Sequence, residues 1–336
     1  MERVTMADVA KEAGVSKSTV SQFLNKRYTY MSEETRRRIQ SAIEELGYHP
    51  NYVARSLKQK RTSMIGIIVA NIMHRFSTEI SHAIEDYCYD ADIQAIVCNA
   101  DDDPAKEKKY IETLMAKQVD GLIIFPTGYN VDLYNNMIKT GYPVVFMDRK
   151  VGETNLPRVV ANNVESSYQA VQHFIENNHK RISIITQELK ISPRIERLEG
   201  YKKCLQDHHI ELNEDYIIHT QIDRIHLELE KMFSLEHAPT ALLAGNDLVF
   251  LEILKFIKEK KLTLPDDFSL IVFDNIPFAD YSNPAVSTIS QPALDMGQKA
   301  AELLLKQINK EDIERIEYEY ACKMYIRETS AKLNEH

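Results

Sequence analysis

The sequence is poor in the residues on which several classes of functional site depend. It has only ten glycines among 336 residues and no GxG pair, so it carries neither a dinucleotide-binding fingerprint nor a phosphate-binding loop. No HExxH or GxSxG motif occurs. The four cysteines lie far apart without a CxxC pair, which indicates neither a disulfide framework nor a zinc site. We therefore expect no catalytic residue, no metal and no cofactor.

Long apolar runs are also missing. No segment approaches the roughly 18 consecutive apolar residues of a membrane helix, and residues 1–14 lack the apolar core of a signal peptide. These absences predict a soluble, cytoplasmic protein without a membrane partner. With 336 residues, 44% of them hydrophobic, the chain has room for a small head and about two further domains.

Charge is unevenly distributed along the chain. Residues 1–61 hold 12 Lys and Arg against 7 Asp and Glu, a net of +5, whereas the remainder holds 29 against 43, a net of −14. A basic head on an acidic body attracts phosphate at one end and repels it elsewhere. The charge pattern therefore favours a local contact between the head and nucleic acid.

Residues 5–25 predict two short helices joined by a tight turn, as in a helix-turn-helix. Thr5 and Asp8 have the spacing of a capping box, and Gly14 suits the turn. Ser16 is a good N-cap for the second helix. Such a recognition helix presents its polar side chains to base edges in the major groove. The candidate DNA-binding residues of this segment are Thr5, Ser16, Lys17, Ser18, Thr19, Ser21, Gln22 and Asn25.

A third helix is predicted over residues 32–47, since Ser32 can cap its start and Gly47 can close its end. Its apolar stripe can complete a three-helix core. Arg36, Arg37 and Arg38 on this helix could contact phosphate or only face solvent. Residues 50–62 then form a short segment with helix propensity, too short to be stable alone.

From residue 63 onward, short apolar runs alternate with amphipathic segments. This alternation predicts parallel sheets flanked by helices, and the series restarts around residues 149–163, which indicates two similar lobes. The predicted strands cover residues 64–69, 95–99, 121–125 and 143–148 of the first series, and 181–186, 240–245, 269–274 and 287–290 of the second.

The chain resembles the LacI/GalR family of bacterial repressors. The resemblance begins with T-x-x-D-V-A-x-x-A-G-V-S-x-x-T-V-S from Thr5, and continues through E-L-x-Y-x-P-N and A-R-x-L to residue 57. In the body it is carried by VDGLI, by the DR that follows VVFM, by RxxGY, by ND and by the closing DN and STISQP. These motifs occur in the family's order along the whole chain.

The resemblance implies a fold and a division into domains. We expect a small all-α helix-turn-helix head over residues 1–49, a hinge over 50–62, and an α/β body like that of periplasmic binding proteins over 63–330. The body would have two lobes with parallel sheets, residues 63–160 with 292–320 and residues 163–288 with 321–330. The chain would cross between them near 155–163, 288–292 and 320.

The same resemblance implies how DNA is bound. A homodimer would read a near-palindromic double-stranded operator, with paired hinge helices inserting Leu57 into the minor groove beside Ala54. Asn51 matches a family position in the same segment. Leu57 could instead pack on the head.

Two features of the head depart from the family's pattern. The position of Gln22 is commonly Arg in the family. Because Gln suits adenine whereas Arg suits guanine, the operator is expected to carry an A·T pair there. The loop over residues 25–32 is long and aromatic, and Tyr28 or Tyr30 could contact the DNA backbone or pack on the third helix.

In open α/β sheets ligands bind beyond the carboxyl ends of the strands, here between the lobes. Carboxylates and amides suit sugar hydroxyls, and an aromatic ring suits the apolar face of a sugar. Asn246 and Asp274 could also act as helix caps. The resemblance implies that Phe76, Asp148, Arg197, Asn246 and Asp274 line the effector pocket. The candidate effector-binding residues are therefore Arg75, Phe76, Asp148, Arg149, Arg197, Asn246 and Asp274.

The number of cations near this cleft suggests an acidic effector. Lys190, Arg194 and His74 add to the three arginines above, so we expect a sugar acid, best 2-keto-3-deoxygluconate or a related uronate catabolite, as in the ketogluconate regulators that the chain resembles. The predicted function is repression of carbohydrate catabolism genes, relieved by the effector. Two alternatives are control by a phosphoprotein corepressor and a free sugar-binding protein.

Overall fold

The computed structural model describes residues 4–49, 61–152 and 154–333. Internal contacts divide the chain into two compact units, residues 1–62 and residues 63–336. The first unit is called the head and the second the body. Asn51, Ala54 and Leu57, which the sequence analysis assigned to DNA binding, lie outside the described residues.

The head is a bundle of three short helices. Thr5 and Asp8 form the predicted capping box of the first helix, with the Thr5 amide donating to the Asp8 carboxylate at 2.8 Å. Ser32 caps the third helix, which Gly47 ends in the left-handed conformation. Val9, Val20 and Ile39 among others form the buried core. The helices are α1 (Met6–Glu12), α2 (Lys17–Leu24) and α3 (Glu33–Leu46).

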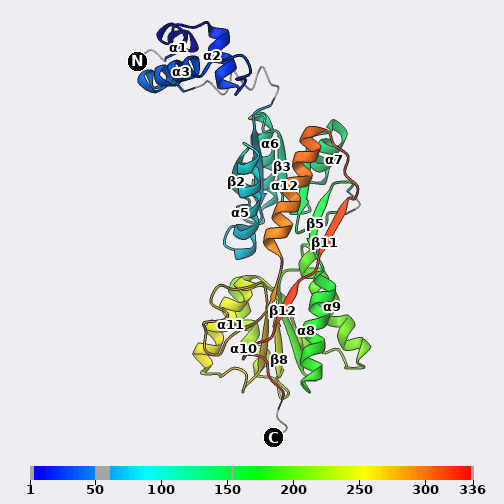
Figure 1. Cartoon of the computed structure of the whole chain (residues 1–336). Helices are drawn as coiled ribbons and strands as arrows, with labels where there is room; N and C mark the ends of the chain where they lie inside the picture. Colours follow the sequence, from blue (N-terminus) through cyan, green and yellow to red (C-terminus); the bar gives the residue numbers. More distant parts are fainter. Residues whose placement is uncertain (1–3, 50–60, 153, 334–336) are drawn as a thin grey trace. The chain divides into compact units, whose positions relative to one another are not determined.

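The body has two lobes, each built on a six-stranded sheet (Figure 1). The sheet of the N-lobe has the order β11-β5-β4-β3-β1-β2, and every pair in it is parallel. Its strands are β1 (Met64–Val69), β2 (Gln94–Asn99), β3 (Gly121–Ile124), β4 (Val144–Met147), β5 (Arg158–Ala161) and β11 (Glu317–Tyr320). Its helices are α5 (Arg75–Asp90), α6 (Pro104–Ala116), α7 (Val131–Thr140) and α12 (Ala293–Asn309).

The C-lobe repeats this plan with the order β12-β10-β9-β8-β6-β7, in which only β12 runs antiparallel to its neighbour. Its strands are β6 (Ile182–Gln187), β7 (Ile217–Thr220), β8 (Ala241–Ala244), β9 (Ser269–Phe273), β10 (Ser287–Ser290) and β12 (Lys323–Tyr325). Its helices are α8 (Asn163–Glu176), α9 (Ser192–Asp207), α10 (Ile225–Phe233) and α11 (Asp247–Lys260), with 3-10 turns η1 (Glu214–Tyr216) and η2 (Ile222–Arg224).

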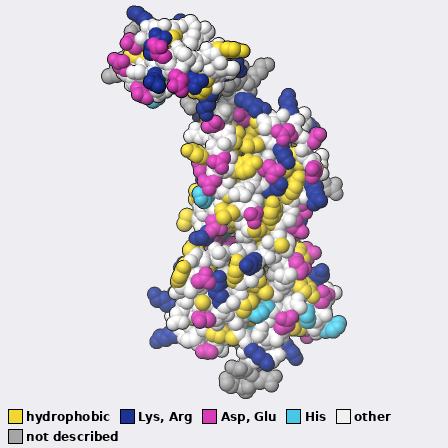
Figure 2. All heavy atoms as spheres, in the orientation of Figure 1, with side chains coloured by type: hydrophobic (Ala, Val, Ile, Leu, Met, Phe, Trp, Pro, Cys, Tyr) yellow, Lys and Arg dark blue, Asp and Glu magenta, His cyan; other side chains and the backbone are white. Residues whose placement is uncertain are grey.

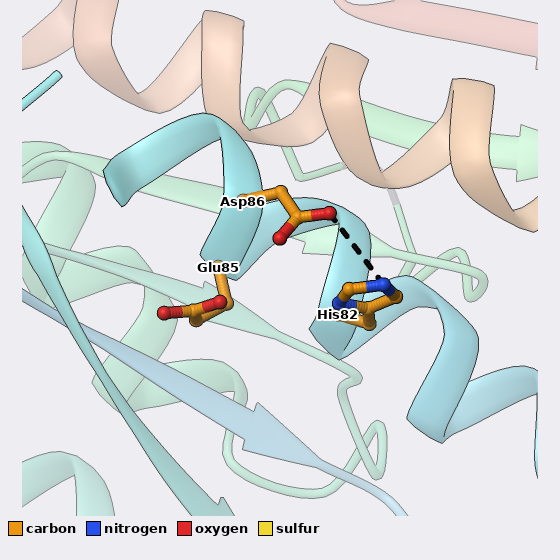
Figure 3. Close-up of side chains that lie close together, drawn as sticks. All are labelled: His82, Glu85 and Asp86. Carbon is orange, nitrogen blue, oxygen red and sulfur yellow. Dashed lines mark ion pairs between the residues drawn. The ribbon is translucent and has the colours of Figure 1, made fainter. Parts of the chain in front are cut away.

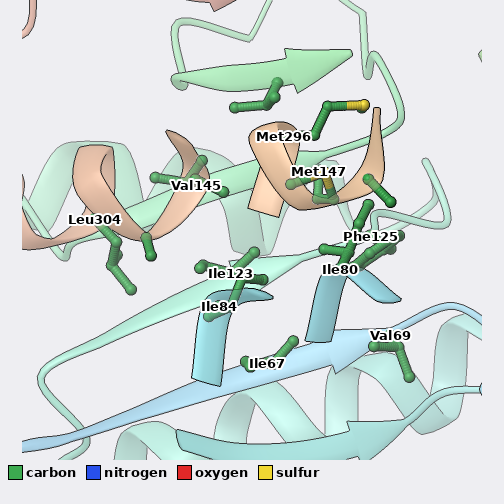
Figure 4. Packing of buried hydrophobic residues seen from close by; sticks show 14 of the residues in the cluster. Ile67, Val69, Ile80, Ile84, Ile123, Phe125, Val145, Met147, Met296 and Leu304 are labelled. Atoms are coloured by element: carbon green, nitrogen blue, oxygen red, sulfur yellow. The ribbon is translucent and has the colours of Figure 1, made fainter. Parts of the chain in front are cut away.

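Each sheet is covered by helices on both faces, which explains the near-continuous apolar strands. In the N-lobe, α5 and α12 cover one face, and α6 and α7 cover the other. Figure 4 shows the first of these cores, with Ile80, Ile84, Met296 and Leu304 facing Ile67, Ile123 and Val145. In the C-lobe, α8 and α9 oppose α10 and α11. The predicted fold class is confirmed.

A glycine brings two covering helices together in each lobe. A Cβ on Gly297 of α12 would lie 2.7 Å from the Cβ of Ala83 on α5. A Cβ on Gly200 of α9 would lie 2.1 Å from the carbonyl oxygen of Val164 on α8. Only glycine therefore allows the close approach of α9 to α8.

The chain passes between the lobes three times, at Asn162, at Gln291 with Pro292, and at residues 321–322. Two of these passages are tied together, because the Oδ1 atom of Asn162 accepts a hydrogen bond from the amide of Cys322 at 2.8 Å. The strands of both sheets thus end near the passages, and the loops that follow them form the cleft.

Candidate functional site

The head presents a polar helix start. The Ser16 hydroxyl accepts a hydrogen bond from the Thr19 amide at 3.2 Å, which caps α2 as predicted. Ser16 and Ser18 hydroxyls lie 2.6 Å apart. Of the predicted DNA contacts on this segment, Thr5, Ser16, Lys17, Ser18 and Gln22 are exposed, and Thr19, Ser21 and Asn25 are half-buried. The arrangement leaves the first turn and one face of α2 accessible to a ligand.

The aromatic loop before α3 divides into a packed and an exposed tyrosine. The Tyr28 ring lies 4.2 Å from the Arg36 guanidinium and makes an edge contact with Phe23. Arg36 also donates to the Tyr28 carbonyl oxygen at 3.3 Å. Tyr30 is fully exposed. Tyr28 and Arg36 therefore have a structural role, while Tyr30 is accessible.

In the body, a small cavity of about 50 Å³ lies between the lobes; it is called the inner cavity. Six of the seven predicted effector-binding residues line it. The lining consists of Ala70, His74, Phe76, Ser77, Phe125, Asp148, Arg149, Ile191, Pro193, Arg194, Arg197, Asn246, Asp274 and Gln291. Asp148 and Arg149 follow β4, Asn246 follows β8 and Asp274 follows β9, as expected for the carboxyl ends of the strands.

Arg75 is the one predicted effector residue that does not line the inner cavity. Its Nε atom pairs with Glu79 one turn further along α5 at 2.6 Å. The pair directs the guanidinium along the helix, so Arg75 contributes its backbone amide to the cleft and not its side chain.

Several cations of the cleft have acidic partners, which reduces the surplus of positive charge inferred from the sequence. Arg149 pairs with Asp102 at 2.7 Å, and Arg194 approaches the same carboxylate at 3.5 Å. Lys190 is exposed and pairs with Glu188 at 2.9 Å. Burial opposes ionisation of Asp102, but the two arginines outweigh burial and lower its pKa. Across the visible face of the body, acidic and basic side chains are likewise interspersed (Figure 2).

Arg197 is held rigidly in the C-lobe. Its Nε atom donates to Asn163 Oδ1 at 2.9 Å, and its Nη1 atom donates to the Gly245 carbonyl oxygen at 2.6 Å. Its guanidinium lies 3.6 Å from the centre of the Phe273 ring. Arg197 is 5% exposed, so it fixes the cleft wall as well as lining the cavity.

Two buried carboxylates face this arginine. Burial raises the pKa of Asp148 to about 6, even though Arg149 and Arg197 lie nearby. Burial also raises the pKa of Asp274, which accepts a hydrogen bond from Gln291 Nε2 at 2.5 Å. The suggestion that Asp274 caps a helix is wrong, because residues 275–286 form turns. Asn246 does cap α11, accepting from the Val249 amide at 2.9 Å.

Asp247 joins the two lobes. Its carboxylate lies 2.6 Å from His74 Nδ1 and accepts a hydrogen bond from the Arg75 amide at 3.0 Å. A carboxylate at the start of α11 in the C-lobe thus accepts a hydrogen bond from a backbone amide at the start of α5 in the N-lobe, which has no partner within its own helix. Burial opposes the charge, but the hydrogen bonds from His74 and the amides outweigh it and lower the pKa of Asp247.

Sequence comparisons identify the architecture. Residues 5–51 match the profile of the bacterial regulatory proteins of the lacI family, and residues 171–330 match that of a periplasmic binding protein-like domain. The "Probable HTH-type transcriptional regulator EndR" of Paenibacillus polymyxa is 47% identical over 98% of this chain and 99% of its own. The chain belongs to the LacI family.

Two further proteins are similar to this LacI-family protein over nearly its whole length. The "HTH-type transcriptional repressor PurR" of Aliivibrio salmonicida is 35% identical over 98% of this chain and 99% of its own. The crystal structure of the Lac repressor dimer bound to operator and the anti-inducer ONPF matches with a TM-score of 0.86 and 25% identity, over 98% of this chain and 100% of that one. The LacI-family protein is therefore a transcriptional regulator with the Lac repressor fold.

Three groups in the cleft of this LacI-family protein are not among the predicted effector-binding residues, although one of them, Asp247, directly follows a predicted strand end. Gln291 follows β10, where the rule of strand ends could have found it. Asp102 lies in the loop after β2, and Asp247 lies beside the predicted Asn246. Both carboxylates contact side chains that come from other segments of the chain, so these contacts have no signal in the local sequence.

One group of side chains in the described part of the LacI-family protein could offer three ligand atoms to a metal. His82, Glu85 and Asp86 are exposed neighbours on α5, and His82 pairs with Asp86 at 3.5 Å (Figure 3). They lie on one face of one helix, and no second element of the described chain encloses them, so we assign no metal site here. No helix among the described residues is long and apolar enough to cross a membrane.

Proposed function

We propose that this regulator represses transcription as a homodimer on a near-palindromic operator and is released by a small hydroxyl-rich effector. Three features of the head support DNA binding: its net charge of +5 over residues 1–61, the exposed polar start of α2, and the likeness to a Lac repressor dimer bound to operator. Carbohydrate catabolism is the proposed field of regulation, since the effector chemistry points to sugars.

The observation that carries the effector proposal is a set of buried polar atoms around the inner cavity. Asp148 Oδ1, Arg149 Nε and Gln291 Oε1 have no hydrogen-bond partner within the described residues. A buried polar atom without a partner costs about 1–3 kcal/mol. A ligand with several hydroxyl groups can donate to the two oxygens, accept from the nitrogen, and cover Phe76 with an apolar face.

The ionisation of the cleft favours a neutral ligand. Two arginines share the carboxylate of Asp102, and two further carboxylates, those of Asp148 and Asp274, line the inner cavity beside Arg197. We therefore propose a neutral sugar as the first candidate, in place of the sugar acid suggested by counting cations. A sugar acid such as 2-keto-3-deoxygluconate remains a class for the experiment to test.

The alternatives make different predictions. A free sugar-binding protein would share the body but would not need a helix-turn-helix head, which this chain has. A regulator controlled by a phosphoprotein would release or bind its operator without responding to any metabolite alone. The release of DNA on effector binding follows only if the effector binds the two arrangements of the body with different affinity.

The test is a thermal-shift screen of the purified protein against neutral sugars, sugar acids, sugar phosphates and nucleobases. A ligand at 100 times its Kd stabilises the protein by about 2.7 kcal/mol. Asp148→Asn should lose the shift, whereas Arg75→Ala, whose side chain lies outside the inner cavity, should keep it. Each hit is then added to protein bound to an operator selected from a random pool, with fluorescence anisotropy reporting release.

Each outcome has a distinct meaning. A shift confined to neutral sugars supports the proposal, and a shift confined to acids restores the sugar acid. A ligand that stabilises Asp148→Asn as much as wild type binds elsewhere. If no class shifts the protein, the effector proposal fails and the phosphoprotein alternative takes its place.

A further inference from the structure

The cleft contains a second and larger cavity beside the inner one. The inner cavity measures about 50 Å³, and the second, called the outer cavity, measures about 280 Å³. Because a cavity needs roughly 10–15 Å³ to hold one water molecule, the inner cavity has room for the volume of a few water molecules, which limits it to one sugar unit at most. Most of the space for a ligand lies in the outer cavity.

Both lobes contribute to the outer cavity, and the two cavities adjoin. Ile191 and Arg194 line both of them. A molecule that fills the outer cavity would therefore touch both lobes, and one that also enters the inner cavity would pass Arg194. Other residues that line the outer cavity are Asn71, Thr127 and Tyr129 of the N-lobe and Gln187, Thr220 and Gln221 of the C-lobe.

We propose that the outer cavity is a binding subsite for a second sugar unit, so that the effector is a saccharide of at least two rings. This inference rests on the proposed sugar effector. The outer lining is rich in amides and hydroxyls, the groups that bond sugar hydroxyls. Its charges are matched, since Lys190 pairs with Glu188 at 2.9 Å and Asp101 pairs with Lys106 at 2.5 Å. The lining chemistry thus suits a neutral, hydroxyl-rich unit.

Tyr129 supplies the aromatic surface of this subsite. It is 63% exposed, although its loop is firmly anchored. The fully buried carboxylate of Glu107 accepts hydrogen bonds from the Thr127 amide at 3.0 Å and from the Tyr134 hydroxyl. On the other side of Tyr129, Asn130 donates to the Pro104 carbonyl oxygen at 2.9 Å.

The anchoring of this loop suggests that Tyr129 serves to bind a ligand. Burying a carboxylate is costly unless its hydrogen bonds are satisfied, and Glu107 is buried where it fixes the loop that carries an exposed ring. A ring held in place before binding loses little conformational entropy when a ligand packs on it. Tyr129 is therefore positioned to cover the apolar face of a sugar at the outer cavity.

Calorimetric titration of the full-length protein tests the inference with matched pairs of sugars. The pairs are glucose with cellobiose and with maltose, galactose with lactose, and xylose with xylobiose. At least one disaccharide should bind about tenfold more tightly than its monosaccharide, which corresponds to about 1.4 kcal/mol. Tyr129→Ala should remove this difference, and Tyr129→Phe should keep it.

Tyr89→Ala is the matched control. Tyr89 is 74% exposed near the far end of α5, about 21 Å along the helix from its start at the cleft. This variant should bind every sugar as wild type does. Tyr129→Ala should also melt at the wild-type temperature without ligand, because the side chain is exposed.

Four results would count against the inference in different ways. If every monosaccharide that binds does so as tightly as its disaccharides, or if the Tyr129→Ala variant retains the full disaccharide preference, the outer subsite is overturned and the sugar effector is left intact. Equal weakening of both sugars by Tyr129→Ala overturns it as well. Failure of every saccharide to bind overturns the proposed sugar effector itself.

Discussion

Replacing Asp148 by asparagine should stabilise the ligand-free body while removing effector binding. The carboxylate is buried in the cleft, and burial raises its pKa to about 6 from an ordinary value of 3.8. An acid with a raised pKa in the folded state holds its proton more tightly when folded. It therefore costs stability once the pH exceeds the unfolded pKa, and this cost grows until the pH passes the folded pKa.

The magnitude follows from the two pKa values. A folded pKa of about 6 against 3.8 in the unfolded chain corresponds to a cost of about 3 kcal/mol at pH 7 and about half of that at pH 5. Asp148→Asn keeps the shape of the side chain and removes this cost. Arg149 retains its partner Asp102 at 2.7 Å, so the substitution leaves no unpaired arginine there.

The assay is thermal unfolding of the ligand-free protein at pH 5 and pH 7, followed by circular dichroism. For a body of this size, about 3 kcal/mol corresponds to a rise in Tm of roughly 6 °C. Asp102→Asn is the control, because this substitution should lower the Tm at pH 7 where Asp148→Asn should raise it. The pKa of Asp102 is lowered in the fold, so its carboxylate contributes stability at neutral pH that is lost as the pH falls. Equal Tm values for Asp148→Asn and wild type at pH 7, or a gain that does not shrink at pH 5, would refute the reasoning.

Three further substitutions test other parts of the structure. Asp247→Asn should destabilise the body by about 2 kcal/mol, because the contacts with His74 and the Arg75 amide lose the charge of the carboxylate. Urea unfolding at pH 7 measures this loss, and an unchanged midpoint would show that these contacts do not hold the lobes together. Gly200→Ala should lower the free energy of unfolding by roughly 3 kcal/mol in the same assay, because the new Cβ would overlap the Val164 carbonyl oxygen and force α9 away from α8. A stability equal to wild type would mean that the two helices move apart without cost. Gln22→Arg should change the selected operator from A·T to G·C at the contacted position, and identical consensus sequences from random-pool selection would exclude a base contact by Gln22.

Most strands that were predicted from the sequence are buried apolar runs, although the predicted strand β2 has only half-buried and exposed residues. The central strands β1, β3, β4, β6, β8 and β9 are apolar runs because helices cover both faces. The strands that were not predicted are β5, β7, β11 and β12. The sequence of β11, EYEY, has no apolar run, and this strand exists because it pairs with β5, which lies more than 150 residues earlier. Such a strand is specified by its partner and not by its own pattern.

In the candidate site, too, some residues could be located from the sequence and others only from the fold. The rule that ligands bind beyond strand ends located Asp148, Arg149, Asn246 and Asp274, each of which lines the inner cavity. Being next to a cleft residue in the sequence was a poorer guide to which side chains line the cavity. Arg75 lies beside Phe76, yet its side chain pairs with Glu79 along the same helix. Counting cations left out their acidic partners for a related reason: the carboxylate that pairs with Arg149 comes from the loop after β2, and only the fold brings the two together.

The contacts between the lobes determine how much an effector can contribute. The chain itself joins the lobes through Asp247 with His74 and through Asp102 with Arg194, so closure does not depend wholly on a ligand. Among the described residues that line the inner cavity, three buried atoms have no hydrogen-bond partner: Asp148 Oδ1, Arg149 Nε and Gln291 Oε1. If an effector pairs with these atoms only in the closed arrangement, each contributes about 1–3 kcal/mol to its differential affinity. One or two such bonds reach the 1–3 kcal/mol typical of coupling between distant sites, so a neutral ligand needs no net charge to shift the equilibrium.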